Sequence, residues 1–229
     1  MFCVIVSLER RIKPAHNFLT NLTAKVTLSP MKSASIRHAA RRGAFHAVIG
    51  LAVVAALFFL PRFTVVAALA VVTAGFLSLE AARLYVPSLN KCFSVWFASL
   101  LREEERSKLT GSSYFLIGCL ITVLAFRQDI ATLAILFLSL GDPTATVVGM
   151  WKRRVRLWGK SIEGNIACLT VCLFTGIPVA TILENLTLTV AIVGAVFATL
   201  FQALPLRLSD NLTIPLGSAI TMTVISILT

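Results

Sequence analysis

The sequence is short of charge, and of negative charge above all. Only 14% of its 229 residues are charged, and 10 Asp and Glu stand against 21 Lys and Arg, which gives a formal net charge of +11. Because soluble domains carry about 25% charged residues, this composition argues against an ordinary water-soluble fold. The apolar residues make up 57% of the chain and stand in long blocks without alternation, which indicates that lipid is the solvent.

The cysteines lack the spacing that metal or disulfide chemistry needs. The chain has five of them, with no Cys-x-x-Cys pair and no His at ligand spacing. Cys168 and Cys172 lie four residues apart inside an apolar block, as small core residues do. We therefore predict neither a zinc site nor a disulfide framework.

Seven apolar blocks follow a polar and basic segment, residues 1–40. A helix needs about 20 residues to span a bilayer, and about 17–25 is usual. The blocks predict an all-α polytopic membrane bundle of about seven transmembrane helices, at residues 44–60, 63–79, 112–126, 129–149, 164–182, 186–206 and 212–229. We thus expect a single membrane domain at 41–229. Met31 offers an alternative start, so residues 1–30 are either a disordered tail or a misassigned beginning.

The basic residues alternate between the connections of these blocks. Nineteen of the 21 Lys and Arg precede the first block or lie in 80–111, 150–163 and 207–211. The positive-inside rule then predicts a cytoplasmic N-terminus and a multi-pass integral membrane protein with its site on the cytoplasmic face. We expect no nucleic-acid partner, because basic residues between apolar blocks fix topology and meet anionic headgroups.

The segment 80–111 has an apolar periodicity of its own. Apolar residues recur at helical spacing and precede Arg102 and the run Glu103–Glu105; they are Leu89, Phe93, Phe97, Leu100 and Leu101. This pattern predicts an amphipathic helix, either at the cytoplasmic interface or as a soluble cap on the bundle.

An acidic residue falls inside the fourth apolar block. An ionisable group within a bilayer costs about 2.5–3.5 kcal/mol on insertion scales, so Asp142 is the strongest candidate for function. Gly141 and Pro143 flank it and predict a break in the helix, with Asp142 capping the second half. Free N–H groups at such a break would face a bound anion. The alternative is a proline kink with a capping Asp.

Two further polar motifs stand at the predicted cytoplasmic ends of spans. Lys160 and Glu163 lie in a Gly-Lys-Ser segment, but Arg154 stands where a P-loop needs glycine, so we reject a P-loop. Asp210 and Asn211 open the last block, and one N-cap needs only one of them. Weaker candidates on the same side are Arg42, His46, Glu80, Arg83 and Asn90. Such carboxylates and cations suit a nucleotide triphosphate with its divalent ion.

The order of these motifs resembles the CTP-dependent lipid-alcohol kinases, which include yeast-type diacylglycerol kinase, dolichol kinase, and phytol and polyprenol kinases. The resemblance covers about residues 38–220. The matching segments are Arg41-Arg-Gly-Ala-Phe-His46, Glu80-Ala-Ala-Arg83 with Asn90, Thr110-Gly-Ser-Ser-Tyr-Phe-Leu-Ile-Gly118, Gly141-Asp142, Gly159-Lys-Ser-Ile-Glu-Gly164 and Asp210-Asn-Leu-Thr-Ile-Pro215. Two positions depart from the family pattern: this chain has Arg41-Arg42-Gly43 where the first motif usually reads Arg-Lys before the His, and Pro143 follows Asp142 where small or hydroxyl residues are commoner.

The resemblance implies a transferase of phospholipid metabolism. Its activity would be transfer of the CTP γ-phosphoryl group to the hydroxyl of diacylglycerol, polyprenol, dolichol or phytol, with Mg²⁺ or another divalent cation. On the matched motifs we expect Asp142, Lys160 and Glu163 to be catalytic, and Asp142 and Asp210 to hold the metal. The expected nucleotide-binding residues are Arg42, His46, Arg83, Lys160 and Asn211. The expected lipid-binding residues are Glu80, Asn90 and Tyr114.

Two other functions stay open. A phosphatidate cytidylyltransferase-like enzyme would also use CTP at a membrane but would release pyrophosphate, and the acidic C-terminal signature of that family is not seen. A small transporter or lipid-binding protein is the second alternative. Transporters often carry repeats and broken helices in both halves, whereas the polar motifs here gather on one side. The kinase is therefore the preferred hypothesis.

Overall fold

The computed structural model describes residues 33–151, 156–157, 159–183, 186–206 and 208–228. The chain divides into two compact units, Met1–Arg37 and His38–Thr229. In the first unit, Ser33–Arg37 are helical, and Arg37 Nη1 donates to Ser33 Oγ at 2.9 Å. Residues 1–30, for which the sequence left two interpretations open, lie outside the described residues.

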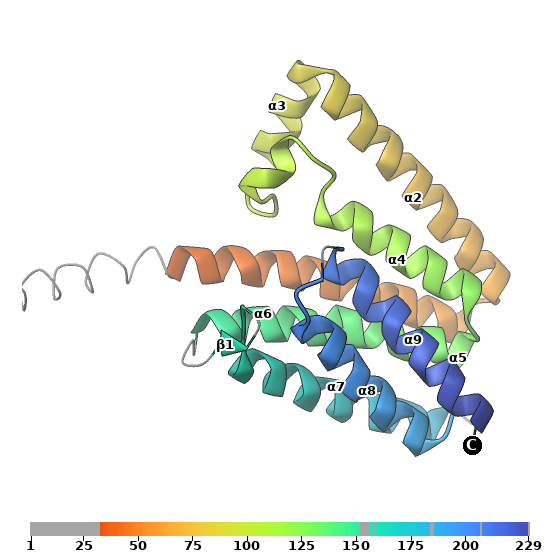
Figure 1. Cartoon of the computed structure of the whole chain (residues 1–229). Coiled ribbons are helices and arrows are strands. Elements are labelled where there is room, and N and C mark those ends of the chain that lie inside the picture. The colour runs from red at the N-terminus through yellow and green to blue at the C-terminus, as the bar shows by residue number, and fades with distance from the viewer. Residues whose placement is uncertain (1–32, 152–155, 158, 184–185, 207, 229) are drawn as a thin grey trace, which may run out of the picture. The chain divides into compact units, whose positions relative to one another are not determined.

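The second unit is helical nearly throughout its described part (Figure 1). Its helices are the N-terminal helix Ser33–Phe59, α2 Arg62–Tyr85, α3 Pro87–Trp96, α4 Gly111–Ala125, α5 Gln128–Leu136, α6 Asp142–Trp151, α7 Ile162–Ile182, α8 Leu188–Ala203 and α9 Asp210–Leu228. Shorter elements are the 3₁₀ turn Glu103–Arg106 and the π-helical turn Phe137–Gly141, with the two-residue strands β1 Arg156–Leu157 and β2 Lys160–Ser161. The predicted all-α class is confirmed.

Five of these helices are long and apolar enough to cross a membrane, with mean hydropathy from 1.6 to 2.0. They are Ser33–Phe59, Arg62–Tyr85, Gln128–Trp151, Ile162–Ile182 and Asp210–Leu228. The apolar helices α4 and α8 are shorter, at 15 and 16 residues. All seven predicted blocks are therefore helical, and their length and composition indicate an integral membrane protein. The count of seven spans and their orientation stay predictions.

The fourth block supplies the centre of the core. Buried apolar side chains follow one another through α5 and the π-helical turn, among them Ile130, Leu133 and Phe137, all with 0% exposure. Around this segment α4 contacts both α2 and α9, and α8 contacts both α7 and α9, as Figure 1 shows for α4 between α2 and α9. A helix enclosed on all sides by other helices is shielded from lipid, so polar groups on it face protein.

The same block forms one continuous helix, and the predicted break at Gly141 is wrong. Asp142 has helical φ and ψ of −63° and −47°, and the π-helical turn joins α5 directly to α6. In a regular α-helix the Pro143 ring collides with the carbonyl of the residue four positions earlier, which is Ser139. The wider π turn gives that carbonyl room. Asp142 consequently caps no second helix, and no free N–H groups face an anion there.

Two glycines let the N-terminal helix approach this turn closely. A Cβ on Gly43 would lie 2.7 Å from Cβ of Pro143, and a Cβ on Gly50 would lie 2.6 Å from Cβ of Ser139. Neither distance is possible between real side chains, so any larger residue would push the helix away. Because Arg42 adjoins Gly43, this approach also sets the distance between Arg42 and the start of α6.

The predicted amphipathic helix is present as α3, but it ends at Trp96, before the last apolar residues of the pattern. Phe93 faces inward and is 9% exposed, whereas Trp96 is 80% exposed. After it the chain turns and forms the short 3₁₀ helix Glu103–Arg106 before α4 begins. The position of α3 at a membrane interface stays a prediction.

Candidate active site

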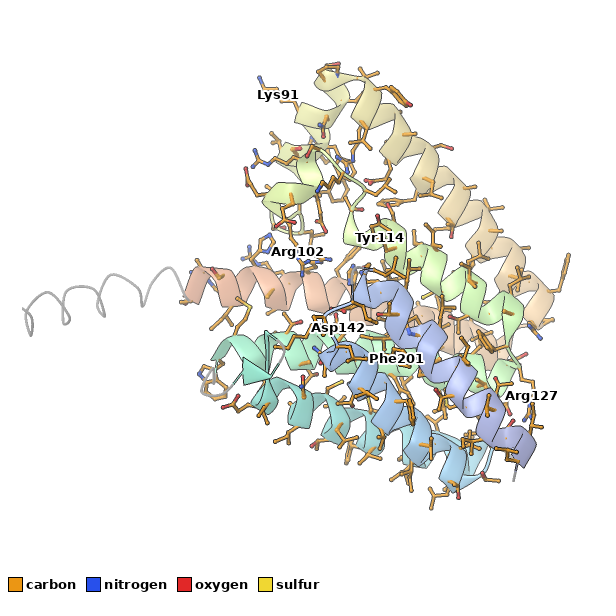
Figure 2. All side chains as sticks on the ribbon, viewed as in Figure 1. Lys91, Arg102, Tyr114, Arg127, Asp142 and Phe201 are labelled. Carbon is orange, nitrogen blue, oxygen red and sulfur yellow. The ribbon has the colours of Figure 1, made fainter. Side chains whose placement is uncertain are left out.

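A cavity of about 250 Å³ collects polar side chains from segments that are far apart in the sequence. Its polar lining consists of Arg42, Arg102, Asp142, Thr146, Lys160, Ser209, Asp210 and Asn211. Figure 2 shows Asp142 on α6 and Arg102 on the connection before α4, on opposite sides of the N-terminal helix in this view. The volume is close to the lower end of the range for small-molecule pockets, about 300–1,000 Å³.

Lys160 reaches this cavity from a two-stranded hairpin. The strands pair antiparallel, with Arg156 opposite Ser161 and Leu157 opposite Lys160. Gly159, directly before Lys160, has a φ of 88°, a conformation that glycine adopts without the steric penalty of a Cβ. The glycine of the Gly-Lys-Ser segment therefore shapes the turn of a hairpin.

The ammonium group of Lys160 has two protein partners. Its Nζ donates to Asp210 Oδ2 at 2.8 Å and to the backbone carbonyl oxygen of Gln202. The Lys160 and Asp210 side chains are still 27% and 35% exposed. An ion pair this open to solvent contributes at most about 1 kcal/mol to stability, so it leaves both groups able to exchange partners with a ligand.

Asp142 stands at the first position of α6 and is half-buried. Its carboxylate is repelled by Asp210 and attracted by Lys160, Arg42 and Arg102. Within the described part of the chain, no basic group lies within ion-pair distance of it. Two carboxylates that share a cavity repel each other until a cation or a proton intervenes.

The donor set suits a magnesium ion that arrives with a nucleotide. The described residues contain no group of three or more His, Cys, Asp or Glu that could hold a metal ion. Mg²⁺ is usually bound through one or two carboxylates together with substrate phosphates and water. Asp142 and Asp210 offer that number of carboxylates, and Lys160, Arg42 and Arg102 offer positive charge for phosphate oxygens.

Arg42 is held at the cavity by a residue that sequence reasoning missed. Its Nη1 lies 3.2 Å from Glu105 Oε1. Glu105 is 8% exposed, and its two oxygens accept from the backbone N–H groups of Gly111 and Arg102, both at 2.9 Å. In the sequence Glu105 is one of three consecutive Glu residues. Arg102, where a capping box has Ser or Thr, precedes it by three residues, so no sequence signal set Glu105 apart.

Asn211 lines the cavity and also joins two helices. It is 4% exposed, and its Nδ2 donates to the Gly111 carbonyl oxygen at 2.7 Å. That bond ties the start of α9 to the start of α4, so part of the predicted nucleotide-binding amide is already engaged. Arg102 and Thr146 line the same cavity, and neither was predicted; a basic residue in a polar loop and a threonine in an apolar helix give no distinguishing signal.

Three predicted residues form a closed network instead. Arg83 and Glu80 are fully buried, and Arg83 Nε and Nη2 donate to the two oxygens of Glu80 at 2.8 and 3.0 Å. Arg83 Nη1 donates to Asn90 Oδ1 at 3.1 Å, and Nη2 also donates to the backbone oxygens of Glu105 and Lys108. A guanidinium with these partners holds the connection between α3 and α4 in place. It does not line the cavity, so the predicted roles of Arg83 in nucleotide binding and of Glu80 and Asn90 in lipid binding gain no support here.

The three remaining candidates also lie away from the cavity lining. His46 is 4% exposed and stacks on Phe115 with 4.8 Å between ring centroids. Its Nε2 lies 3.5 Å from Ser112 Oγ. Glu163 lies in the first turn of α7, and Tyr114 is half-buried on α4. The geometry thus brings together five predicted residues: Arg42, Asp142, Lys160, Asp210 and Asn211.

Comparisons with known proteins point in part toward a lipid kinase. An uncharacterized protein of Rickettsia prowazekii (strain Madrid E) is 28% identical over 172 residues, which cover 72% of this chain and 84% of that protein. The CTP-dependent diacylglycerol kinase 1 of Schizosaccharomyces pombe is 32% identical over 74 residues, which cover 32% of this chain and 31% of that protein. No family model matches the chain, and no solved structure matches it significantly. The similarity to a kinase therefore extends over about a third of each chain.

Proposed function

We propose that the chain is a CTP-dependent lipid kinase that phosphorylates the hydroxyl of a membrane lipid alcohol. The observation that carries the proposal is one cavity, on a bundle of membrane-length helices, in which Asp142 and Asp210 face Lys160 and two arginines. The partial similarity to a CTP-dependent diacylglycerol kinase supports CTP as the donor. The cavity residues alone select a polyphosphate and give no preference among bases.

Charge explains why this cavity favours a nucleotide triphosphate. The side chains of Arg42, Arg102 and Lys160 are donors to phosphate oxygens, and arginine pairs with phosphate in a bidentate manner. Asp142 and Asp210 would hold Mg²⁺, which would supply positive charge to the donor's phosphate groups. The ligand would relieve the repulsion between the two carboxylates, so ligand and cavity stabilise each other.

The reaction needs positioning and charge stabilisation more than covalent catalysis. The oxygen of the lipid hydroxyl forms a bond to the γ-phosphorus, and the bond between that phosphorus and the bridging β–γ oxygen breaks. CDP leaves with the electron pair of the broken bond. Asp142 accepts the hydroxyl proton and passes it to water, and Lys160 neutralises the charge on the transferring group.

A membrane bundle suits this acceptor because its hydroxyl lies at headgroup depth while its tail stays in hydrocarbon. Diacylglycerol, polyprenol, dolichol and phytol all present one hydroxyl in this way. The excess of Lys and Arg in the connections that bear the cavity supports a cytoplasmic site, where CTP is available. A cytoplasmic orientation of the cavity therefore forms part of the proposal.

The test is product analysis with purified protein in mixed micelles, Mg²⁺, and CTP labelled on either the α or the γ phosphate. A panel of the four lipid alcohols and phosphatidate serves as acceptor. We expect γ label in the lipid product and release of CDP. α label in lipid with release of pyrophosphate would identify a cytidylyltransferase instead. Solute uptake into proteoliposomes without nucleotide turnover would identify a transporter.

A further inference from the structure

A second, apolar cavity meets the polar cavity at Arg42. Its volume is about 40 Å³, and its apolar lining consists of Phe45, Phe76, Phe93, Phe97, Leu100 and Leu101. Arg42 lines both cavities. Four aromatic rings beside a charged site are more than the packing of helices against one another requires. The rings come from the N-terminal helix, α2, α3 and the turn after it.

The boundary between the two cavities is an ion pair held in a fixed position. Arg42 and Glu105 are 15% and 10% exposed at their side chains and lie 3.2 Å apart. The backbone N–H groups of Gly111 and Arg102 fix the Glu105 carboxylate. The polar cavity, with the charges that we propose bind phosphate, thus lies on one side of Arg42, and the apolar side chains lie on the other. The ion pair leaves the guanidinium little freedom to move away.

The size and opening of the apolar cavity restrict what it can hold. A water-sized group needs about 10–15 Å³ by this measure, so the cavity admits roughly three such groups, too few for a sugar or a base. Phe45 and Phe97 are 37% and 39% exposed, so the lining reaches the surface of the bundle. Phe45 belongs to the membrane-length helix Ser33–Phe59, beside which hydrocarbon chains are the neighbouring molecules.

Resting on the proposed function, we propose that this apolar cavity binds the first few carbons of the lipid acceptor's chain and presents the hydroxyl at Arg42. The acceptor would enter laterally from the membrane, and the nucleotide would enter from the polar side. Arg42 is then in contact with both substrates. This assignment replaces Glu80 and Asn90, whose polar groups are engaged in the closed network.

The test is to fill the cavity and compare the two substrates. We expect Leu101→Trp to raise the KM for the lipid alcohol by at least tenfold and to leave the KM for CTP within twofold. Leu124→Trp is the matched control, because Leu124 is 61% exposed on α4 and lines neither cavity. Phe97→Ala enlarges the cavity, and we expect it to shift preference toward acceptors with bulkier proximal chains.

A photoreactive lipid alcohol with a diazirine near its hydroxyl gives a second readout that requires no turnover. We expect crosslinks within residues 93–101, competed by unlabelled alcohol. An unchanged lipid KM in folded Leu101→Trp, or crosslinks confined to segments that do not line this cavity, would overturn the cavity assignment and leave the kinase proposal standing. Absence of turnover with every alcohol would overturn the kinase proposal. If Leu101→Trp does not fold, the acceptor preference of Phe97→Ala and the positions of the crosslinks test the cavity assignment.

Discussion

Two polar clusters in this protein have similar composition and opposite character. In the cluster of Glu80, Arg83 and Asn90, the Glu80 and Arg83 side chains are 0% exposed, and the guanidinium is surrounded by protein acceptors. In the cavity, the paired Lys160 and Asp210 are 27% and 35% exposed, and a further carboxylate stands nearby. The first cluster satisfies its own charges, whereas the second leaves charge for a ligand.

The difference separates a structural use of these residue types from the catalytic use that we propose. Breaking a buried pair strands a charge and destabilises the fold, whereas removing a ligand-facing charge changes binding or turnover and leaves the fold intact. Substitutions in the two clusters should therefore affect different measurements.

The largest effect is expected from Asp142→Asn, which removes the proposed proton acceptor and metal ligand. Loss of a general base typically costs about 10²–10⁴-fold in rate, and we expect a fall of that size in kcat with CTP and a lipid alcohol. The unfolding temperature should stay near the wild-type value. Asp129→Asn is the matched control, because Asp129 lies in the same continuous helix and pairs with Arg127. Figure 2 shows Arg127 well away from Asp142. Equal activity in the two variants would contradict the assignment.

Arg83→Ala should give the opposite pattern. Removal of one partner of a buried pair costs about 3–5 kcal/mol, and we expect a corresponding loss in the free energy of unfolding, measured with denaturant in micelles. The protein that remains folded should keep its KM for CTP. Full stability combined with loss of nucleotide binding would place Arg83 at the active site and erase the contrast between the clusters.

Lys160→Met should have an intermediate effect on nucleotide binding. A hydrogen bond to a charged group is worth about 1.5–3 kcal/mol, so we expect the KM for CTP to rise about tenfold to hundredfold. Lys160→Arg should restore part of the loss because the charge returns. If Lys160→Met leaves the KM for CTP unchanged, the ammonium serves only the pair with Asp210.

Gly159→Ala should have the smallest effect. A side chain in the left-handed region costs about 1–2 kcal/mol, and a shifted hairpin displaces Lys160 from the cavity. We expect about a fivefold rise in the KM for CTP. Gly75→Ala is a suitable control, because Gly75 lies within α2 and a Cβ there meets no other atom within 4 Å. Identical kinetics in the two variants would show that the turn does not position Lys160.

The sequence predicted the helices better than it predicted the site. All seven apolar blocks are helical because hydrophobic length is a local property that needs no partner. The connection of the fourth block was predicted wrongly, since a π turn that ends before Pro143 and a break at Gly141 are compatible with the same residue pattern. Only the packing of the N-terminal helix against Ser139 and Pro143 distinguishes them.

Contacts that no sequence pattern reveals also limited the prediction of the charged site residues. Asp142 was identified because a carboxylate in an apolar block is costly. Arg83 was a weaker candidate, and its acceptors include backbone oxygens at Glu105 and Lys108, which no sequence pattern reveals. Glu105 was overlooked for the converse reason: it is buried against Arg42, which is distant in the sequence, and against the backbone of nearby Gly111.

The most direct test of the open cavity is thermal unfolding of the purified protein with and without Mg²⁺ and CTP. A ligand at one hundred times its Kd stabilises the folded state by about 2.7 kcal/mol. We predict that CTP with Mg²⁺ raises the unfolding temperature of the wild type and of Asp129→Asn, and that Asp142→Asn loses most of this shift. An unfolding temperature of the wild type that CTP and Mg²⁺ leave unchanged at saturating concentrations would contradict the account.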